Sequence, residues 1–422
     1  MRKPGLSRLT VLAAPALFAA LVSSVISGCG SGSSSSNGGG GGGGGGSTSN
    51  QQAITVNTGP ALSAGRIATN IAFTSVTICV PNSTSQCQTI DGVLVDTGSS
   101  GFRVLSSVLT LSLPQQKDSG GNPIAECTLF VSDETWGPVV TADITIAGQK
   151  ASAQPIQVIG GGSGSLATPP TSCSNQGPVN DTLASFGANG ILGVGNFIQD
   201  CGPGCAPGTT SNPGFYYTCS SSCTVTTVAL TSQVSNPVVA FEKDNNGVIV
   251  ELPSATVPQA SLTGSLIFGI GTESNNGLGG ATVYTVNPSN GNFNTIFKGV
   301  TYTDAAFLDS GSNAIYFLDS NTTGLPLCTG TINFWYCPAS TQNFMATNQA
   351  YPAGATTTIN FSVSNAQTLT SNQSDGVAPG LAGPGLNAGT FDWGLPFFYG
   401  RNVYVAIEGQ STPGGTGPYV AY

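Results

Sequence analysis

The stretch Gly92-Val-Leu-Val-Asp-Thr-Gly-Ser-Ser100 carries an apolar run into a single aspartate, Asp96, and then into Thr, Gly and Ser. The stretch Ala305-Ala-Phe-Leu-Asp-Ser-Gly-Ser-Asn313 repeats this pattern around Asp309. In a chain so rich in these residues, about half an Asp-[Ser/Thr]-Gly match is expected by chance, so a single copy means little, and an Asx turn at the end of a strand would explain it. Two copies with similar flanks favour an internal duplication, in which each half delivers one carboxylate.

A second pair of similar segments follows the two aspartates. Gly190-Ile-Leu-Gly-Val194 comes after the first copy, and Phe391-Asp-Trp-Gly-Leu395 comes at a similar distance after the second. Around them the chain consists of short runs rich in Val, Ile, Thr and Phe, separated by Gly, Pro, Asn and Ser. This pattern is typical of an all-β protein. We therefore expect two related lobes, at residues 55–240 and 241–422.

The duplicated plan resembles the bilobal pepsin-like aspartic peptidases, which are distantly related to the retropepsins. The resemblance implies two β-barrel-like lobes with a cleft between them, each lobe giving one Asp loop that a later apolar-Gly segment closes into a psi-shaped motif. Gly264-Ser-Leu-Ile-Phe-Gly-Ile-Gly271 is similar to the family's strand and turn early in the second lobe. The chain also resembles an uncharacterised bacterial lipoprotein family that shares the duplicated motif.

Two carboxylates held close together in a half-buried cleft cannot both ionise, so they share one proton. The ionised member can take a proton from a bound water that attacks a peptide carbonyl, while the protonated member polarises the carbonyl oxygen. This chemistry needs no metal and no cofactor. We therefore expect Asp96 and Asp309 to be the catalytic pair of an aspartic endopeptidase acting on peptides or unfolded proteins.

The resemblance also assigns supporting roles to the residues that follow each aspartate. The glycines allow close backbone approach. The Thr or Ser directly after each aspartate links the two loops by hydrogen bonds, and the Ser after each glycine hydrogen-bonds the outer carboxylate oxygen. These supporting residues are Thr97, Gly98, Ser99, Ser310, Gly311 and Ser312.

Pepsin-like enzymes close the cleft with a hairpin flap that carries a Tyr, and the corresponding segment here, Phe130 to Pro138, has none. Trp136 is the candidate lid aromatic, and its alternative is a Trp packed in the core of the first lobe. Since the flap Tyr is missing, a non-catalytic surface binding or adhesion lipoprotein with the same cleft is the second functional hypothesis. A disulfide-rich structural surface module is the third.

The composition excludes several classes of protein. The chain has no His, so it cannot build a Ser-His or Cys-His nucleophile pair or a His-ligated metal site. Ten Lys and Arg against nineteen Asp and Glu give a net charge of −9. A protein that binds the nucleic-acid backbone needs the opposite balance, so we expect no nucleic-acid partner.

The N-terminus has the pattern of a bacterial export signal. Arg2 and Lys3 precede an apolar run that ends in Ile26-Ser-Gly-Cys29, which resembles a lipobox. We expect residues 1–28 to be the signal peptide, Cys29 to carry the lipid, and residues 29–54, rich in Gly and Ser, to be a flexible tether. Gly30 is typical of lipoproteins sent to the outer membrane. The alternatives are an uncleaved membrane anchor and a simply secreted protein. We expect a lipid-anchored monomer.

Removing Cys29 from the eleven cysteines leaves ten, an even number that favours five disulfides in an exported chain. Two pairs flank short loops, four cysteines form a symmetric cluster that suits a nested hairpin pairing, and one pair remains by elimination. For the cluster, a CxxxC…CxxxC metal site is the alternative. The expected pairs are Cys79–Cys87, Cys328–Cys337, Cys201–Cys223, Cys205–Cys219 and Cys127–Cys173.

Overall fold

The computed structural model describes residues 50–61, 68–130, 134–175 and 177–422. The signal segment, Cys29 and most of the expected tether lie outside these residues. The last residues of that expected tether, 51–54, belong to a strand, which corrects the boundary. Asn50 already contacts the fold, because its side-chain amide donates to the carbonyl oxygen of Phe268 at 3.0 Å.

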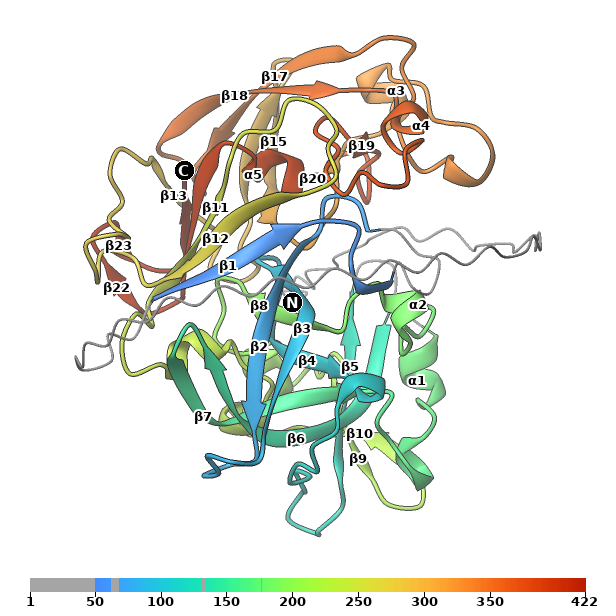
Figure 1. Ribbon diagram of the computed structural model, residues 1–422, viewed down its shortest axis with the longest axis vertical. Coiled ribbons are helices and arrows are strands. Elements are labelled where there is room, and N and C mark those ends of the chain that lie inside the picture. The colour runs from blue at the N-terminus through green and yellow to red at the C-terminus, as the bar shows by residue number, and fades with distance from the viewer. Residues whose placement is uncertain (1–49, 62–67, 131–133, 176) are drawn as a thin grey trace, which may run out of the picture.

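The first lobe is built from ten strands among the described residues (Figure 1). They are β1 (Gln51–Val56), β2 (Ala72–Cys79), β3 (Cys87–Asp96), β4 (Ser100–Leu105), β5 (Ile124–Leu129), β6 (Glu134–Ile146), β7 (Gln149–Ile159), β8 (Gly190–Val194), β9 (Tyr216–Cys219) and β10 (Cys223–Val225).

The second lobe contains the remaining described strands (Figure 1). They are β11 (Gly247–Leu252), β12 (Leu262–Phe268), β13 (Val283–Thr285), β14 (Phe293–Phe297), β15 (Val300–Asp309), β16 (Ile315–Phe317), β17 (Gln342–Gln349), β18 (Thr356–Val363), β19 (Ala382–Gly383), β20 (Phe391–Gly394), β21 (Arg401–Ala406), β22 (Ser411–Thr412), β23 (Gly415–Thr416) and β24 (Tyr419–Ala421).

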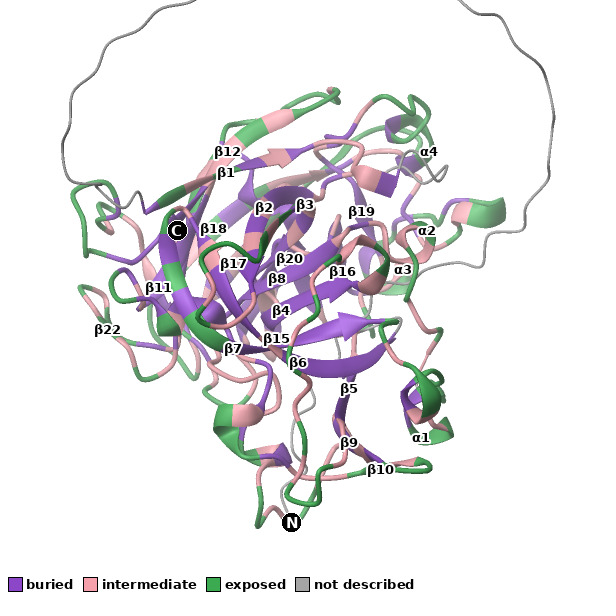
Figure 2. Ribbon diagram, turned by 60° about the horizontal axis from the view of Figure 1, so that its bottom comes forward, coloured by how far each residue is buried: buried purple, intermediate pink, exposed green. Residues whose placement is uncertain are grey.

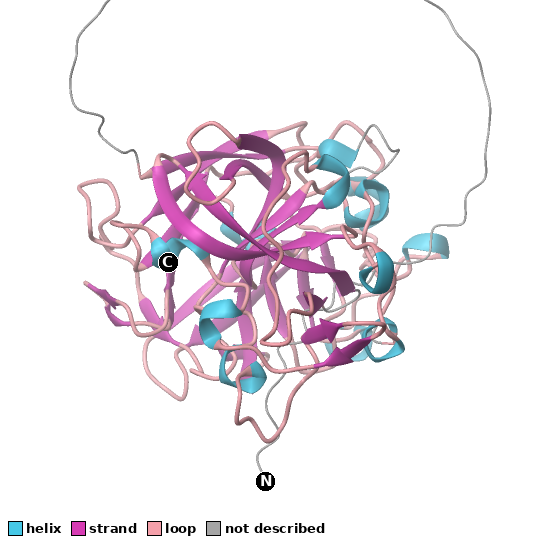
Figure 3. Ribbon diagram, turned by 90° about the horizontal axis from the view of Figure 1, so that it is seen from below, coloured by secondary structure: helices cyan, strands magenta, loops and turns pink. Residues whose placement is uncertain are grey.

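The α-helices are short, each of them a single turn (Figure 3). They are α1 (Thr171–Ser174), α2 (Leu183–Phe186), α3 (Ser320–Thr323), α4 (Ala366–Leu369) and α5 (Leu395–Phe398). Side-chain caps help to fix such short turns: Asp319 accepts from the backbone N–H of Thr322 at 2.7 Å, before α3. No helix in the described part of the chain is long and apolar enough to cross a membrane.

One large sheet crosses from the first lobe into the second, and a separate sheet is confined to the second lobe. The large sheet has the order β10-β9-β5-β6-β7-β4-β8-β3-β2-β1-β12-β11-β21-β24-β13, and the other has the order β18-β17-β14-β15-β20-β16-β19. Strand β1 joins the lobes, because it pairs antiparallel with β2 on one side and with β12 on the other. The all-β, two-lobed architecture expected from the sequence is confirmed.

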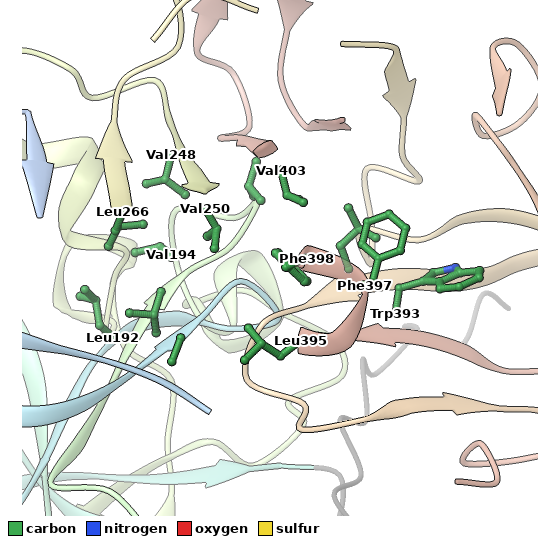
Figure 4. Close-up of a cluster of buried hydrophobic side chains, with 14 of the residues drawn as sticks. Leu192, Val194, Val248, Val250, Leu266, Trp393, Leu395, Phe397, Phe398 and Val403 are labelled. Carbon is green, nitrogen blue, oxygen red and sulfur yellow. The ribbon is translucent and has the colours of Figure 1, made fainter. Parts of the chain in front are cut away.

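The alternation of buried and exposed side chains along the strands shows which face of the sheet covers the core. In β3, Val93 and Val95 are buried while Asp91 is exposed, as a strand covered on one face requires. The strands at the centre of the molecule, β4, β8, β16 and β20, are almost wholly buried (Figure 2). One apolar cluster continues between the lobes, from Leu192 and Val194 on β8 to Leu395 and Phe398 on α5 (Figure 4). The two lobes therefore share one apolar core.

The disulfides correct one expectation. Cys79–Cys87, Cys127–Cys173 and Cys328–Cys337 pair as expected. The nested pairing of the four-cysteine cluster, Cys201–Cys223 with Cys205–Cys219, is wrong, because the structure pairs Cys201 with Cys205 and Cys219 with Cys223. Cys219 and Cys223 lie directly opposite each other at the end of the β9–β10 hairpin. With all four sulfurs bonded, none is a free thiolate ligand, which also removes the metal-site alternative.

These local pairs predict the result of a peptide map. Cleavage by chymotrypsin after Phe215, Tyr216 or Tyr217, without reduction, is expected to separate the Cys201–Cys205 peptide from the Cys219–Cys223 peptide, because no disulfide crosses the cut. Mass spectrometry of the unreduced digest checks this. A disulfide-linked peptide pair that spans residue 215 would contradict the local pairing.

Candidate active site

Each aspartate is the last residue of a strand that is flanked by a second strand running in the same direction. In the first lobe β3 pairs parallel with β8, which sets Asp96 opposite Gly193. In the second lobe β15 pairs parallel with β20, which sets Asp309 opposite Gly394. The returning strand, β4 or β16, pairs antiparallel with the other side of the threading strand. The sequence repeat is therefore also a repeat in three dimensions.

The glycines of the threading strands are required by the close backbone approach. A Cβ atom at Gly193 would lie 2.8 Å from the backbone N and C of Ser100. A Cβ atom at Gly394 would lie 2.0 Å from the carbonyl oxygen of Ala314. Both distances are below any tolerable contact, so a larger residue would push the threading strand out of the loop.

The two carboxyl groups meet between the lobes. The backbone N–H of Gly98 donates to Asp96 Oδ1 and that of Gly311 donates to Asp309 Oδ1, each at 2.8 Å. A Cβ atom at Gly98 would lie 2.7 Å from Asp309 Cγ, and one at Gly311 would lie 2.7 Å from Asp96 Oδ1. Each carboxyl group thus lies against the glycine of the other loop. The two carboxyl groups are close enough for Asp96 to raise the pKa of Asp309.

Thr97 and Ser310 link the two loops in a nearly symmetric way. The N–H of Thr97 donates to Ser310 Oγ at 3.1 Å, and the N–H of Ser310 donates to Thr97 Oγ1 at 2.9 Å. Each hydroxyl then donates to a carbonyl oxygen of the opposite lobe: Thr97 Oγ1 to Leu308 at 3.1 Å and Ser310 Oγ to Val95 at 2.8 Å. These four buried hydrogen bonds fix the separation of the two aspartates.

The serines that follow the glycines bind the outer carboxylate oxygens. Ser99 Oγ donates to Asp96 Oδ2, and Ser312 Oγ lies 2.8 Å from Asp309 Oδ2. One further contact was not predicted from the sequence: Ser312 Oγ also lies 2.6 Å from Oδ2 of a third carboxyl group, Asp392. The sequence signal for this contact was an aspartate within the otherwise apolar run Phe391 to Phe398, which indicates a buried carboxyl group.

Burial and the neighbouring carboxyl groups determine the protonation of the second aspartate. Burial raises the pKa of Asp309 well above its ordinary value, and Asp96 and Asp392 raise this pKa further. Asp309 therefore keeps its proton over a range in which an exposed aspartate is ionised.

A cleft of about 570 Å³ lies between the lobes beside the two aspartates: Thr97, next to Asp96, and Leu308, next to Asp309, line it, whereas the two aspartates themselves are buried behind it. Thr97, Gly98 and Ser99 of the first Asp loop line it, together with residues of both lobes. Its apolar wall comes from large side chains, and its polar wall comes largely from amides and hydroxyls. The apolar residues include Phe130, Phe197, Phe215, Tyr302, Phe307 and Leu386, and the polar ones include Asn290, Asn292, Thr303 and Asn387.

The structure places Trp136 away from the cleft. Its side chain is 2% exposed, its indole N–H donates to the carbonyl oxygen of Leu166 at 2.8 Å, and its ring packs edge-on against Tyr217. Trp136 is therefore a core residue beside the Cys127–Cys173 disulfide, in agreement with the alternative interpretation. The β5–β6 hairpin instead directs Phe130 toward the cleft, and its tip, residues 131–133, lies outside the described residues.

A charged cluster that forms part of the cleft wall was also not predicted from the sequence. Arg103 on β4 is fully buried, and its Nη2 contacts Glu126 Oε1 at 2.5 Å and Asp200 Oδ2 at 3.0 Å. Burial opposes ionisation of Glu126, but Arg103 together with hydrogen bonds to Asp200 and Thr128 outweighs burial, so the pKa of Glu126 is lowered. Burial and Glu126 raise the pKa of Asp200 well above its ordinary value. A single Arg in the apolar segment Phe102 to Leu105 was the sequence signal for a buried acidic partner.

Three buried carboxyl groups with raised pKa values give a testable pH dependence of stability. Asp200, Asp309 and Asp392 keep protons in the folded chain that the unfolded chain releases above their ordinary pKa of 3.8. Because the folded state binds more protons, the free energy of unfolding falls as pH rises above about 4. Urea unfolding at pH 4.5 and 7.0 checks this. In Asp309→Asn, the decrease in the free energy of unfolding between these two pH values is expected to be smaller. Equal or greater stability at pH 7.0 would contradict it.

Comparison with known proteins gives a structural likeness and a family. The crystal structure of aspartic proteinase from Irpex lacteus is similar to this chain, with 15% sequence identity and a TM-score of 0.48, over 88% of this chain and 96% of that one. No curated protein matches the chain. A family model described as protein of unknown function (DUF3443) matches residues 46–422, so the chain belongs to this family.

Proposed function

We propose that this protein is an aspartic endopeptidase that hydrolyses peptide bonds with a water molecule activated by Asp96 and Asp309. One observation carries the proposal. Two carboxyl groups from duplicated loops lie beside each other next to a cleft, each against the glycine of the other loop, with their outer oxygens held by Ser99 and Ser312. A structural Asx turn accounts for neither the pairing of the carboxyl groups nor the cross-brace beneath them.

The geometry supports a defined division of labour. Asp309 holds the proton, since its pKa is raised by burial and by its neighbours, and it would donate this proton to the oxygen of the scissile carbonyl. Asp96 would take a proton from water as the water oxygen bonds to the carbonyl carbon. The resulting gem-diol collapses when Asp96 returns its proton to the leaving nitrogen and the C–N bond breaks. Asp309 then recovers its proton from the gem-diol hydroxyl as the carboxyl product forms.

The proposal includes the place of action. The lipobox-like Ile26 to Cys29 supports lipidation of Cys29 after export, and five disulfides within the described residues suit an oxidising compartment. The protein would act as a lipid-anchored monomer of the cell envelope, at the outer membrane, on peptides or unfolded proteins.

The test is cleavage of an unfolded protein mixture by residues 47–422, produced with disulfides formed, from about pH 3 to pH 7. New peptide termini are identified by mass spectrometry, with and without a statine-type inhibitor, which mimics the gem-diol. Inhibitor-sensitive cleavage at defined sites is expected. A folded fragment that cleaves nothing at any pH would overturn the proposal and favour the binding lipoprotein, for which peptide capture without turnover is the expected result.

A further inference from the structure

A third carboxyl group distinguishes the second Asp loop from the first. In the first lobe, the residue of β8 opposite Leu94 is Ile191, two residues before Gly193. In the second lobe, the corresponding residue of β20, opposite Phe307, is Asp392. Both positions are buried. At this matching position, the first lobe therefore has an apolar side chain and the second lobe has a carboxyl group.

The hydrogen bonds of Ser312 make this difference important for the dyad. Ser99 bonds to one carboxyl group, that of Asp96, whereas Ser312 lies between two, with Asp309 Oδ2 at 2.8 Å and Asp392 Oδ2 at 2.6 Å. A hydroxyl has one hydrogen and cannot donate to both. At least one of these two carboxyl groups must therefore carry a proton and donate it to Ser312 Oγ. The proton path can run from Asp392 through Ser312 to Asp309, or in the reverse direction.

The surroundings of Asp392 favour its neutral form. Its Oδ1 atom is buried and has no hydrogen-bond partner in the described part of the chain. Burial raises the pKa of Asp392 well above its ordinary value, Ser312 opposes this shift, and Asp96 adds to it. The titratable groups that face it are Asp309 on β15, Asp96 at the end of β3 and Tyr316 on β16, whose hydroxyl donates to Asn313 Oδ1 at 2.8 Å.

We infer that Asp309, Ser312 and Asp392 form one proton-sharing unit, in which Asp392 is a positioning residue that makes Asp309 the proton-holding member of the dyad. Two carboxyl groups bridged by one hydroxyl release their last proton only at a raised pH, because the second negative charge is created beside the first. Asp96 has no such partner, since Ile191 occupies the matching position. This assignment of roles rests on the proposed peptidase function for its catalytic meaning only.

The proton-sharing unit predicts that replacing Asp392 shifts the pH at which Asp309 loses its proton. When Asp392 is replaced by Asn, the amide can still donate to Ser312, but the second carboxyl group is lost. The last deprotonation of Asp309 then creates no adjacent pair of charges, and it is expected to occur at a pH lower by about one unit or more. Asp392→Ile, which copies the first lobe, removes the donor too and is expected to move the deprotonation in the same direction.

The experiment follows the carboxyl carbons of ¹³C-labelled aspartate by NMR in the purified full-length protein from pH 3 to pH 9, with Asp309 assigned through Asp309→Asn. Asp91→Asn is the matched control, since Asp91 is an exposed aspartate on β3. The highest titration step of Asp309 is expected to fall in Asp392→Asn and to stay in place in Asp91→Asn. An unchanged Asp309 titration in folded Asp392→Asn would overturn the inference.

Activity is read separately. If the protein cleaves peptides, the alkaline limb of kcat/KM is expected to move to lower pH in Asp392→Asn by the same amount as the NMR step. A purely structural role would lower kcat or stability and leave this limb in place, and that result would also overturn the inference. If the wild-type protein cleaves nothing while the NMR shift is present, the peptidase proposal fails and the proton-sharing unit stands.

Discussion

Asp96→Asn is expected to abolish peptide cleavage, lowering kcat/KM by about 10³-fold or more while the protein stays folded. The amide cannot take a proton from the attacking water, and a positioned general base contributes about 10² to 10⁴-fold on its own. The hydrogen bonds of the loop are compatible with Asn, since its side-chain oxygen can still accept from Gly98 N–H. The loss is measured with a peptide whose cleavage site has been mapped.

The control for this variant is Asp91→Asn, which changes an exposed carboxyl group on the same strand, five residues before Asp96. It is expected to keep wild-type activity. If Asp96→Asn retained more than a tenth of the wild-type kcat/KM, the carboxylate of Asp96 would not be the base, and the two-aspartate account would be wrong.

Gly394→Ala is expected to produce the largest loss of stability of any single methyl addition near the site. The new Cβ would lie 2.0 Å from the carbonyl oxygen of Ala314 and 2.6 Å from that of Ser312, both of them backbone atoms that cannot turn aside. Relief requires moving β20 out of the loop, at a cost of about 3 kcal/mol or more. The free energy of unfolding in urea measures it.

The matched control is Gly280→Ala, because a Cβ at Gly280 meets nothing within 4 Å. Its unfolding free energy is expected to stay within about 0.5 kcal/mol of the wild-type value. If Gly394→Ala were equally harmless, β20 would not thread through the second Asp loop as described, and the position of Asp392 beside Ser312 would also be in doubt.

The parts of the site that could be predicted from the sequence are local and duplicated. Each Asp loop is a short run whose apolar strand, aspartate and glycine are adjacent in the chain, so one pattern describes both strand and turn. The threading segments around Gly193 and Gly394 were found for the same reason. The meeting of Asp96 and Asp309 followed only because two copies of one plan imply a symmetric partner for each.

The missed features depend on contacts between distant segments. Arg103 and Asp200 come together only in the folded chain, and no pattern in the sequence around either residue predicts that the two form an ion pair. Asp392 meets Ser312 only because β20 lies between β15 and β16. The pairing predicted for the four-cysteine cluster was wrong for a different reason. Its symmetric spacing fits a nested pairing as well as a local one, and only the position of Cys219 opposite Cys223 on neighbouring strands decides between the two.

The most direct test of the central claim is the rate of cleavage of one mapped peptide by residues 47–422 across pH 3 to 8, for the wild-type chain and for Asp309→Asn. The shared-proton dyad predicts a bell-shaped kcat/KM for the wild type, because one carboxyl group must be ionised and the other protonated. It predicts no measurable rate for Asp309→Asn at any pH. Cleavage that survives Asp309→Asn, or a rate that does not change across this pH range, would contradict the account.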